Sequence, residues 1–271
     1  MNNMNIGVIG IGVVGSAASH GFQKLGHTVV EHDLRFDTTI KDVLGTTVCF
    51  VCVPTPSRED GSCNTEIVED VVAELAVNSY KGIVALKSTI EPGTTQRLQD
   101  RHPGLEICFV PEFLRERCAL SDFIDNHDLC VVGTTNTDTF QTIKDCHGYY
   151  PQKVVQVTPT EAELVKYFNN IYNATLITFA NNFYEVCESL GANYTSVKNA
   201  VVQRDHINNT YLDCNQNLRG FGGVCLPKDT KAINDLVRKR NLPCGLFQTV
   251  LDENDRYITT VFEGMRLGEE E

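Results

Sequence analysis

The chain has 271 residues, enough for one large or two medium domains, and we expect two. Its formal net charge of −12 argues against nucleic acid or an anionic membrane as a partner, because both attract clustered lysine and arginine. The 11 cysteines are an odd number scattered through apolar runs, so we expect free thiols and a cytoplasmic protein. No apolar run approaches the roughly 20 residues of a membrane span.

The first predicted element is a short apolar strand over residues 4–9, followed by a glycine-rich turn and a helix. In the turn, Gly10 permits a sharp bend, Gly12 lets a pyrophosphate approach the backbone, and Gly15 lets the helix pack closely on the strand. This order of strand, turn and helix is the fingerprint of a dinucleotide-binding domain. The residues of this turn that we expect to bind a cofactor are Gly10, Gly12, Val13, Val14 and Gly15.

A second predicted strand, residues 28–32, ends at Asp33, about 20 residues beyond the fingerprint. A carboxylate at this place accepts hydrogen bonds from the adenosine ribose hydroxyls, so Asp33 favours NAD over NADP. Arg35 leaves the alternative open, because a cation could hold the 2′-phosphate of NADP; otherwise it is a solvated loop residue. Residues 39–44 are expected to form one or two helical turns.

The next predicted strand, residues 47–53, contains Cys49 and Cys52 in a C-x-x-C spacing. Residues three apart on a strand point to opposite faces, so we expect neither a metal nor a redox site there. The strand runs into Val53-Pro54-Thr55-Pro56, at the carboxyl end where open parallel sheets bind ligands. The alternative is a plain extended loop, since proline disfavours helix in the residue before it.

A helix is predicted over residues 66–77, with apolar residues at helical spacing, namely Ile67, Val71, Val72, Leu75 and Ala76. A strand over residues 83–87 leads to Ser88-Thr89-Ile90-Glu91-Pro92-Gly93-Thr94-Thr95, where Thr94 or Thr95 could cap the next helix. A strand over residues 106–110 leads to Pro111-Glu112-Phe113-Leu114-Arg115-Glu116, whose charged groups could equally begin a helix with a solvated face. Strands at 129–132 and 154–157 complete an α/β, doubly wound domain over residues 1–158.

Residues 159–271 are expected to form an all-α domain that begins with a long helix. Thr160 is its predicted N-cap and Glu163 completes a capping box, while Gly191 is its predicted end. Lys166 and Asn170, four residues apart, point the same way and could donate to a developing oxyanion. An ordinary polar stripe is the alternative. Further helices are predicted over residues 195–202 and 243–260.

The run from Gly220 to Thr230 holds a candidate nucleophile, Cys225, ahead of a helix predicted over residues 231–240. The helix N-terminus and the nearby Lys228 favour the reactive thiolate. Asp229 lies four residues beyond Cys225 and could take part in proton transfer. The ordinary role of a free cysteine is that of a small buried hydrophobe, so the setting of Cys225 rather than its type makes it a candidate.

The run Gly-Phe-Gly-Gly-x-Cys-Leu-Pro-Lys-Asp closely resembles the catalytic loop of the UDP-glucose/GDP-mannose dehydrogenase family. Val-Pro-Thr-Pro, the Ser88 to Thr95 run, Pro-Glu-Phe-Leu-Arg-Glu and Glu161-Ala162-Glu163-x-x-Lys166-x-x-x-Asn170 are similar to other motifs of the family. The resemblance implies a Rossmann domain followed by a helical central domain, with NAD as cofactor. It also implies four-electron oxidation of the C6 alcohol of a nucleotide sugar to a uronic acid through a cysteine thioester.

The resemblance implies catalytic roles for Thr89, Glu112, Lys166, Asn170, Cys225 and Asp229. It adds cofactor contacts from Val53, Pro54, Thr55, Thr89 and Glu116. It implies substrate contacts from Glu112, Phe113, Leu114, Lys166, Asn170, Phe221, Gly222 and Gly223. The family's arginine that reaches a neighbouring subunit has His206 in its place here, so that role is not carried over.

The resemblance further implies a homodimer through the central helices, and we expect the chain to lack the family's C-terminal nucleotide-binding domain. Two other functions stay open. A β-hydroxyacid or 6-phosphogluconate-type dehydrogenase would share the architecture but needs no thioester. A non-catalytic NAD or sugar-nucleotide binding module, or a half-enzyme that needs a partner, would share the binding motifs.

Overall fold

The structure is a computed structural model that describes residues 3–257. The chain divides into two compact units, one formed by Met1–Pro56 and Asn64–Lys166 and the other by Ser57–Cys63 and Tyr167–Glu271. The division falls inside helix α6 (Pro159–Ser189), whose first residue follows the predicted boundary at residue 158. Within residues 3–257, no helix combines the length and the apolar character needed to cross a membrane.

The first unit is built on a sheet that has seven strands among the described residues, in the order β2-β1-β3-β4-β5-β6-β7. The strands are β1 (Asn5–Ile9), β2 (Thr28–His32), β3 (Val48–Val51), β4 (Ile83–Leu86), β5 (Glu106–Phe109), β6 (Leu129–Gly133) and β7 (Lys153–Val157). Strand order reverses beside β1, because β2 lies on one side of it and β3 on the other. The predicted doubly wound sheet is confirmed, with an addition: β5 and β6 pair antiparallel, while the other neighbours are parallel.

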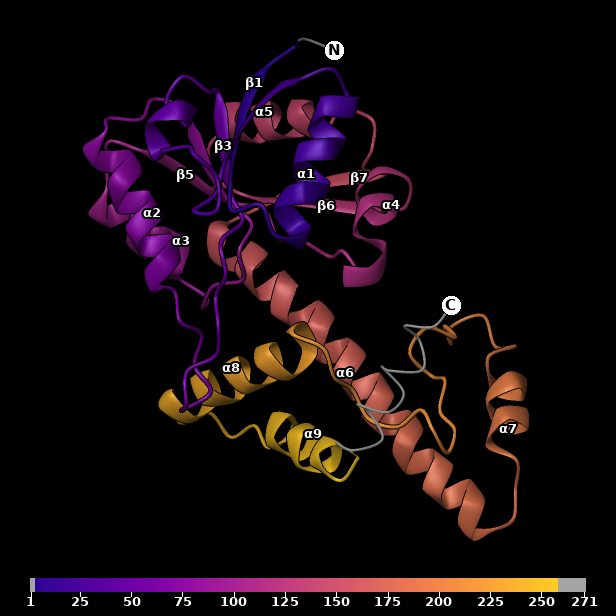
Figure 1. Ribbon diagram of the computed structural model, residues 1–271. Helices are drawn as coiled ribbons and strands as arrows, with labels where there is room; N and C mark the ends of the chain where they lie inside the picture. Colours follow the sequence, from indigo (N-terminus) through magenta and orange to yellow (C-terminus); the bar gives the residue numbers. More distant parts are fainter. Residues whose placement is uncertain (1–2, 258–271) are drawn as a thin grey trace. The chain divides into compact units, whose positions relative to one another are not determined.

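Helices cover both faces of this sheet (Figure 1). One face packs on α2 (Glu66–Val77) and α3 (Thr94–Arg101), and the other on α1 (Val13–Lys24), α4 (Ala119–Ile124) and α5 (Thr137–His147). Two short 3-10 helices, η1 (Ile40–Val43) and η2 (Glu116–Cys118), complete the unit. The apolar side chains that alternate along the strands fill both layers, and each large one buried contributes roughly 1.5–3 kcal/mol.

The C-x-x-C pair behaves as the strand geometry predicts. Cys49 lies in the core on the α2 face and Cys52 packs against the core on the α1 face, so the prediction of opposite faces is confirmed. Burial raises the pKa of the Cys52 thiol to about 12. All 11 cysteines, which lie within the described residues, are free.

Two predicted helix caps are wrong. Helix α6 begins at Pro159, and its capping box joins Thr158 to Glu161 rather than Thr160 to Glu163, with Thr158 N donating to Glu161 Oε2 at 2.8 Å. Neither Thr94 nor Thr95 caps α3, because the N-cap is Gly93. The side chain of Glu163, from helix α6, caps α3 instead. Its carboxylate accepts hydrogen bonds from the Gly93 amide at 2.5 Å and the Thr95 amide at 2.8 Å.

Helix α2 has the predicted bounds, but its buried face is rotated slightly from the predicted one. Ile67, expected on the apolar face, is 40% exposed, and Val68 is buried in its place. The reason is that Val68, Val72 and Leu75 already form an unbroken stripe at spacings of three and four residues. Ile67 lies beside this stripe rather than in it.

The second unit contains the later part of α6 with α7 (Tyr194–Val201), α8 (Cys225–Lys239) and α9 (Leu246–Asp255). Helix α6 ends as predicted, with Gly191 at φ +65 and the Ala192 amide bonded to Cys187 O at 2.9 Å. Helix α8 begins at Cys225 rather than at residue 231, so Cys225 is its first residue. The predicted last helix reached residue 260; Ile258 and the acidic residues 269–271 lie outside the described residues.

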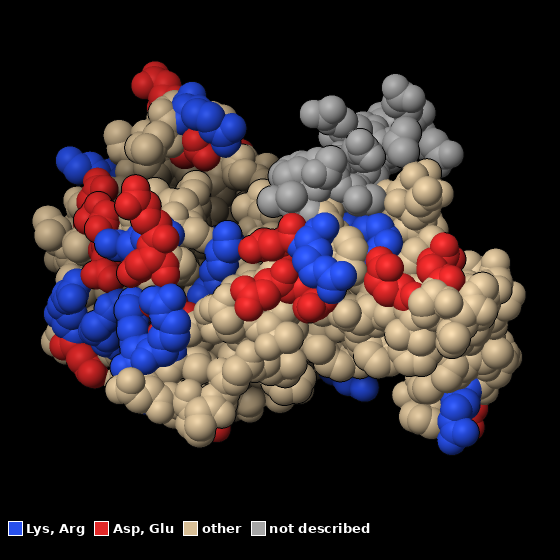
Figure 2. Space-filling model, turned by 90° about the horizontal axis from the view of Figure 1, so that it is seen from below, with Lys and Arg blue, Asp and Glu red and all other residues tan. Residues whose placement is uncertain are grey.

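The segment 57–63 joins the second unit, where Cys63 shares a core with Tyr167, Ile171 and Ile233. On the molecular face in Figure 2, acidic and basic side chains lie side by side rather than in fields of one sign. This face therefore offers no extended basic surface.

Candidate active site

The glycine turn after β1 has the shape that a dinucleotide requires. Gly10 has φ +88, and its amide donates to His32 O at 2.8 Å, which bends the chain sharply. A Cβ at Gly15 would lie 1.9 Å from Gly10 O, so only glycine fits there. A Cβ at Gly12 would meet nothing within 4 Å among the described residues, and Gly12 is the N-cap of α1. Open space beside a helix N-terminus fits a pyrophosphate, so these residues fit NAD.

Asp33 lies at the end of β2, beside the glycine turn. Its Oδ2 accepts from the Ile11 amide at 2.7 Å, and Arg35 Nε donates to its Oδ1 at 2.7 Å. The hydrogen bond from Arg35 is the main cause that holds the pKa of Asp33 well below its usual range, so the group stays ionised. Arg35 is an exposed cation that is paired with Asp33. A carboxylate held in this way can accept from ribose hydroxyls.

The turns after β3 and β4 lie at the same edge of the sheet as the glycine turn. Val53 and Thr55 are buried, while Pro54 is exposed. Ser88 Oγ donates to Val53 O at 2.7 Å, which ties the two turns together and places half-buried Thr89 directly after that anchor. Parallel strands present their carboxyl ends at one edge, which explains why these separate motifs converge.

Glu112 follows β5 at this edge and is buried. Its Oε1 accepts from the Phe113 amide at 2.8 Å and the Leu114 amide at 3.2 Å, and its Oε2 lies 2.9 Å from Lys87 Nζ. Lys166 Nζ donates to the carbonyl oxygen of Glu112. Burial alone would raise the pKa of Glu112, but the charge and the hydrogen bond of Lys87 outweigh it, so the pKa is lowered. Of the catalytic residues predicted in this unit, Glu112 and Lys166 are therefore in direct contact.

The predicted substrate contacts Phe113 and Leu114 use their amides to hold Glu112, and the ring of Phe113 lies 5.8 Å from Lys166 Nζ. Glu116, a predicted cofactor contact, is exposed on η2. The Pro-Glu-Phe-Leu-Arg-Glu run is a loop, and only its end is helical.

In the second unit, the first turn of α8 holds the other predicted catalytic residues. Cys225 is exposed at the first position of the helix, and Asp229 is 0% exposed one turn later. Asn170 Nδ2 donates to Asp229 Oδ2 at 2.6 Å, and Lys228 Nζ forms an ion pair with Asp229 Oδ1 at 2.8 Å. The structure therefore joins Asn170 to Asp229, and Lys228 pairs with the carboxylate.

The glycine loop before Cys225 is anchored through Phe221. The Phe221 amide donates to Asn254 Oδ1 at 2.6 Å, Asn254 Nδ2 donates back to Phe221 O at 2.9 Å, and the ring is buried against Ala174 and Val250. Gly223 has φ +74 and is exposed, and Gly222 is half-buried. The side chain of Phe221 thus fixes the loop from inside the unit.

Arg219 provides a second anchor, which the sequence analysis did not identify. Its guanidinium lies 4.6 Å from the Tyr184 ring and 4.3 Å from the Tyr257 ring. Arg219 Nε donates to Asn181 Oδ1 at 2.7 Å, and a further side-chain hydrogen bond goes to Glu185. The two aromatic rings and the hydrogen bonds offset the hydration that the buried guanidinium loses, so Arg219 can hold the loop while buried.

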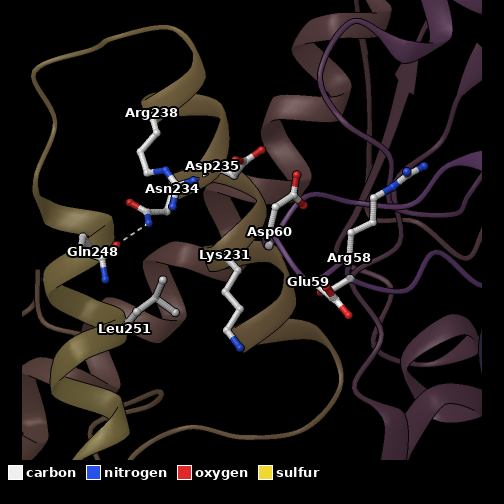
Figure 3. A pocket seen from close by; sticks show the side chains of 11 residues that line it. Arg58, Glu59, Asp60, Lys231, Asn234, Asp235, Arg238, Gln248 and Leu251 are labelled. Carbon is white, nitrogen blue, oxygen red and sulfur yellow. Dashed lines mark hydrogen bonds and ion pairs between the residues drawn. The ribbon is translucent and has the colours of Figure 1, made fainter.

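A cavity of about 250 Å³ lies in the second unit, lined by segment 57–61, α8 and α9 (Figure 3). Its charged lining residues are Arg58, Glu59, Asp60, Lys231, Asp235 and Arg238. Asn234 Nδ2 donates to Gln248 Oε1 at 2.7 Å across its wall. No predicted site residue lines this cavity, and both signs of charge surround it.

Lys87 is the residue of this edge that the sequence analysis missed. It is 4% exposed, and it is the last residue of the predicted strand over residues 83–87. A lysine at the carboxyl end of an otherwise apolar strand was the available signal. A buried lysine needs an acidic partner, and an acidic residue that follows the neighbouring strand, as Glu112 does, is the natural candidate.

The fold and the site geometry define a Rossmann-type dinucleotide-binding protein with a second, helical unit. Residues 30–150 match the NAD binding domain of the UDP-glucose/GDP-mannose dehydrogenase family, and residues 160–256 match its central domain. The chain belongs to this family. The cofactor of its first domain is NAD, as Asp33 predicts.

Curated relatives agree with this assignment. The chain is 28% identical to UDP-glucose 6-dehydrogenase AglM of Haloferax volcanii, in a match that covers 93% of this chain and 70% of the relative. It is 31% identical to UDP-glucose 6-dehydrogenase of Rickettsia typhi, in a match that covers 76% of this chain but 48% of the relative. The chain therefore spans about half the length of the rickettsial relative.

Solved structures share the fold. A UDP-glucose dehydrogenase from Pyrobaculum islandicum has a TM-score of 0.87 and 28% identity, covering 98% of this chain and 72% of that chain. A 3-hydroxyisobutyrate dehydrogenase from Mycobacterium tuberculosis has a TM-score of 0.76 at 15% identity, covering 95% of this chain and 94% of that chain. The second likeness is one of fold alone.

Proposed function

We propose that the chain is the catalytic part of an NAD-dependent nucleotide-sugar 6-dehydrogenase, most like UDP-glucose 6-dehydrogenase. It would oxidise the C6 alcohol to a uronic acid through a thioester on Cys225. The observation that carries the proposal is the first turn of α8, where exposed Cys225 precedes a fully buried Asp229 held by Asn170 and Lys228. An enzyme that only interconverts an alcohol and a carbonyl has no need of this cysteine.

In the proposed first oxidation, the C6 hydroxyl gives its proton to a water assisted by Asp229, Lys166 stabilises the alkoxide, and C6 loses a hydride. Bound NAD accepts one hydride in each of the two oxidations. The Cys225 thiolate then adds to the aldehyde carbon and forms a C–S bond, and loss of a second hydride from C6 leaves the thioester. Covalent attachment prevents escape of the aldehyde between the two oxidations.

Hydrolysis completes the proposed reaction. The oxygen of a water adds to the acyl carbon as one proton of the water passes to Glu112, the C–S bond breaks, and Cys225 leaves as the thiolate. We assign Glu112 and Thr89 to positioning this water, and Lys166 and Asn170 to donating to the oxyanion. Asn170 can serve both tasks, because an amide carries two N–H groups and Asp229 uses one of them.

The test is the stoichiometry of NADH formation from NAD and a panel of UDP- and GDP-sugars. Two NADH per sugar, lost in Cys225→Ser but kept in Cys244→Ser, would support the proposal; Cys244 is the matched control because it is also exposed. One NADH per substrate, unchanged in Cys225→Ser, would favour a β-hydroxyacid-type dehydrogenase. No NADH with any sugar, despite NAD binding, would refute the activity and favour a binding module or a half-enzyme.

We also propose that two copies of the chain associate through α6. Large apolar side chains recur at helical spacing along one side of it and are exposed, namely Phe168, Tyr172, Phe179, Phe183 and Val186, and exposed Leu190 follows directly after the helix. Phe168 is 76% and Phe179 58% exposed. A contiguous apolar stripe of this kind is typical of a protein contact surface. The resemblance to the family favours a second copy as the occupant.

A further inference from the structure

A buried ion pair joins Lys87 to the candidate catalytic carboxylate, Glu112. Strands β4 and β5 are parallel neighbours, with Leu86 in register with Phe109, so the residues that follow them meet at one edge. Lys87 follows β4 there, and its ammonium lies 2.9 Å from Glu112 Oε2. Both side chains are at least nine-tenths buried.

We propose that Lys87 is a positioning residue for Glu112: it neutralises the buried carboxylate and holds it in the orientation that leaves one acceptor site for the hydrolytic water. This inference rests on the proposed function. A carboxylate offers roughly four acceptor sites. The amides of Phe113 and Leu114 use two on Oε1, and Lys87 uses one on Oε2.

Lys87 is the cation that pairs with the Glu112 carboxylate. The other titratable groups that interact with the pair are His127, His147, Cys52, Cys108, Cys130 and Lys166. Lys166 binds the carbonyl oxygen of Glu112 and not its carboxylate. Burial lowers the pKa of His127 and of His147, so both rings are neutral at neutral pH, and burial raises the pKa of the three thiols.

Lys87 itself depends on Glu112. Its ammonium lies 5.9 Å from the Phe50 ring and 6.0 Å from the Phe123 ring, contacts that supply only weak cation–π stabilisation at these distances. Burial alone would lower the pKa of Lys87, but the charge of Glu112 raises it. Burial is the largest single influence on the pKa of Glu112, and without Lys87 its main opposition is gone, so the carboxyl group takes up a proton at higher pH.

The test compares Lys87→Met with Lys87→Arg, and with Lys81→Met as a control at an exposed lysine of the same segment. We expect Lys87→Met to lower kcat roughly 100-fold, the order contributed by a positioned proton-transfer group. The KM for the sugar stays unchanged, and an acid limb enters the pH profile, with the rate rising with pH. Lys87→Arg keeps the positive charge, so its pH profile should lack this acid limb. A rapid burst of two NADH per enzyme, with a uronyl adduct on Cys225 detected by mass spectrometry, would place the defect in hydrolysis.

Lys87→Met with a wild-type pH profile, or with its burst lost in proportion to its turnover, would overturn the inference. A wild-type chain that forms no NADH refutes the proposed function separately. In that case the pH dependence of unfolding decides the remaining part of the inference, that Lys87 keeps the buried Glu112 carboxylate ionised. With Lys87 present, the pKa of Glu112 is lowered, so the wild type should gain stability over Glu112→Gln as pH rises through the usual glutamate range. Without Lys87, burial raises this pKa, so Lys87→Met should lose stability relative to the double variant Lys87→Met, Glu112→Gln over the same rise in pH. The same sign in both pairs would overturn it.

Discussion

Replacing single glycines of the turn after β1 by alanine should separate folding from cofactor binding. In Gly15→Ala, the new methyl carbon would lie 1.9 Å from Gly10 O and 3.4 Å from Cys52 Cβ. The first contact is with backbone, which cannot rotate away, so α1 or the turn must move. In Gly12→Ala, the methyl carbon meets nothing within 4 Å among the described residues.

The expected magnitudes follow from these contacts. Overpacking typically costs about 1–3 kcal/mol, and the backbone clash in Gly15→Ala puts it near about 3 kcal/mol, or a fall in Tm of roughly 6–12 °C. Gly12→Ala should change the unfolding free energy by less than about 1 kcal/mol, because only an N-cap glycine is lost. It should weaken NAD binding at least about tenfold, since the methyl group occupies the approach of the pyrophosphate.

Urea unfolding followed by circular dichroism gives the stabilities, and calorimetric titration with NAD gives the affinities. Gly45→Ala is the control, because a Cβ there also meets nothing within 4 Å and the residue lies outside the turn. It should leave both quantities unchanged. Wild-type NAD affinity in Gly12→Ala would refute the assignment of the cofactor site, and wild-type stability in Gly15→Ala would refute the packing argument.

Three further predictions concern single features. Burial raises the pKa of Glu163, so the folded chain binds its proton more tightly than the unfolded chain. The stability of the wild type relative to Glu163→Gln should therefore fall as pH rises from the usual glutamate range through the raised value, and a rise in denaturation experiments would contradict this. Arg219→Ala should lower the unfolding free energy by about 2–4 kcal/mol, because the ring contacts and hydrogen bonds of the guanidinium are lost. Arg219→Lys should recover part of this loss. A loss under about 1 kcal/mol in Arg219→Ala would count against the role of Arg219 as an anchor. Phe168→Glu combined with Phe183→Glu should give folded monomers in sedimentation velocity, because both rings are exposed and neither fills the core. The Tm of this variant should no longer depend on protein concentration. A monomeric wild type would exclude the α6 dimer.

Features that depend on neighbours along the chain could be predicted from the sequence. The bends at Gly10 and Gly191, the bounds of α2 and the opposite faces of the C-x-x-C pair all follow from backbone freedom or from the periods of 3.6 and 2 residues. The doubly wound sheet follows from alternating strands and helices. Asp33 follows from its distance to the glycine turn.

The tertiary structure alone decided which distant groups meet. Glu163 caps α3 rather than its own helix, Asn170 bonds to Asp229 across 59 residues of chain, and Lys87 pairs with Glu112 because β4 and β5 are neighbours. The sequence shows that a buried charge needs a partner, but the partner is selected by strand order and helix packing, which no local period encodes. The motifs therefore point to the candidate catalytic residues, whereas the partners that hold these side chains in place were decided by the fold.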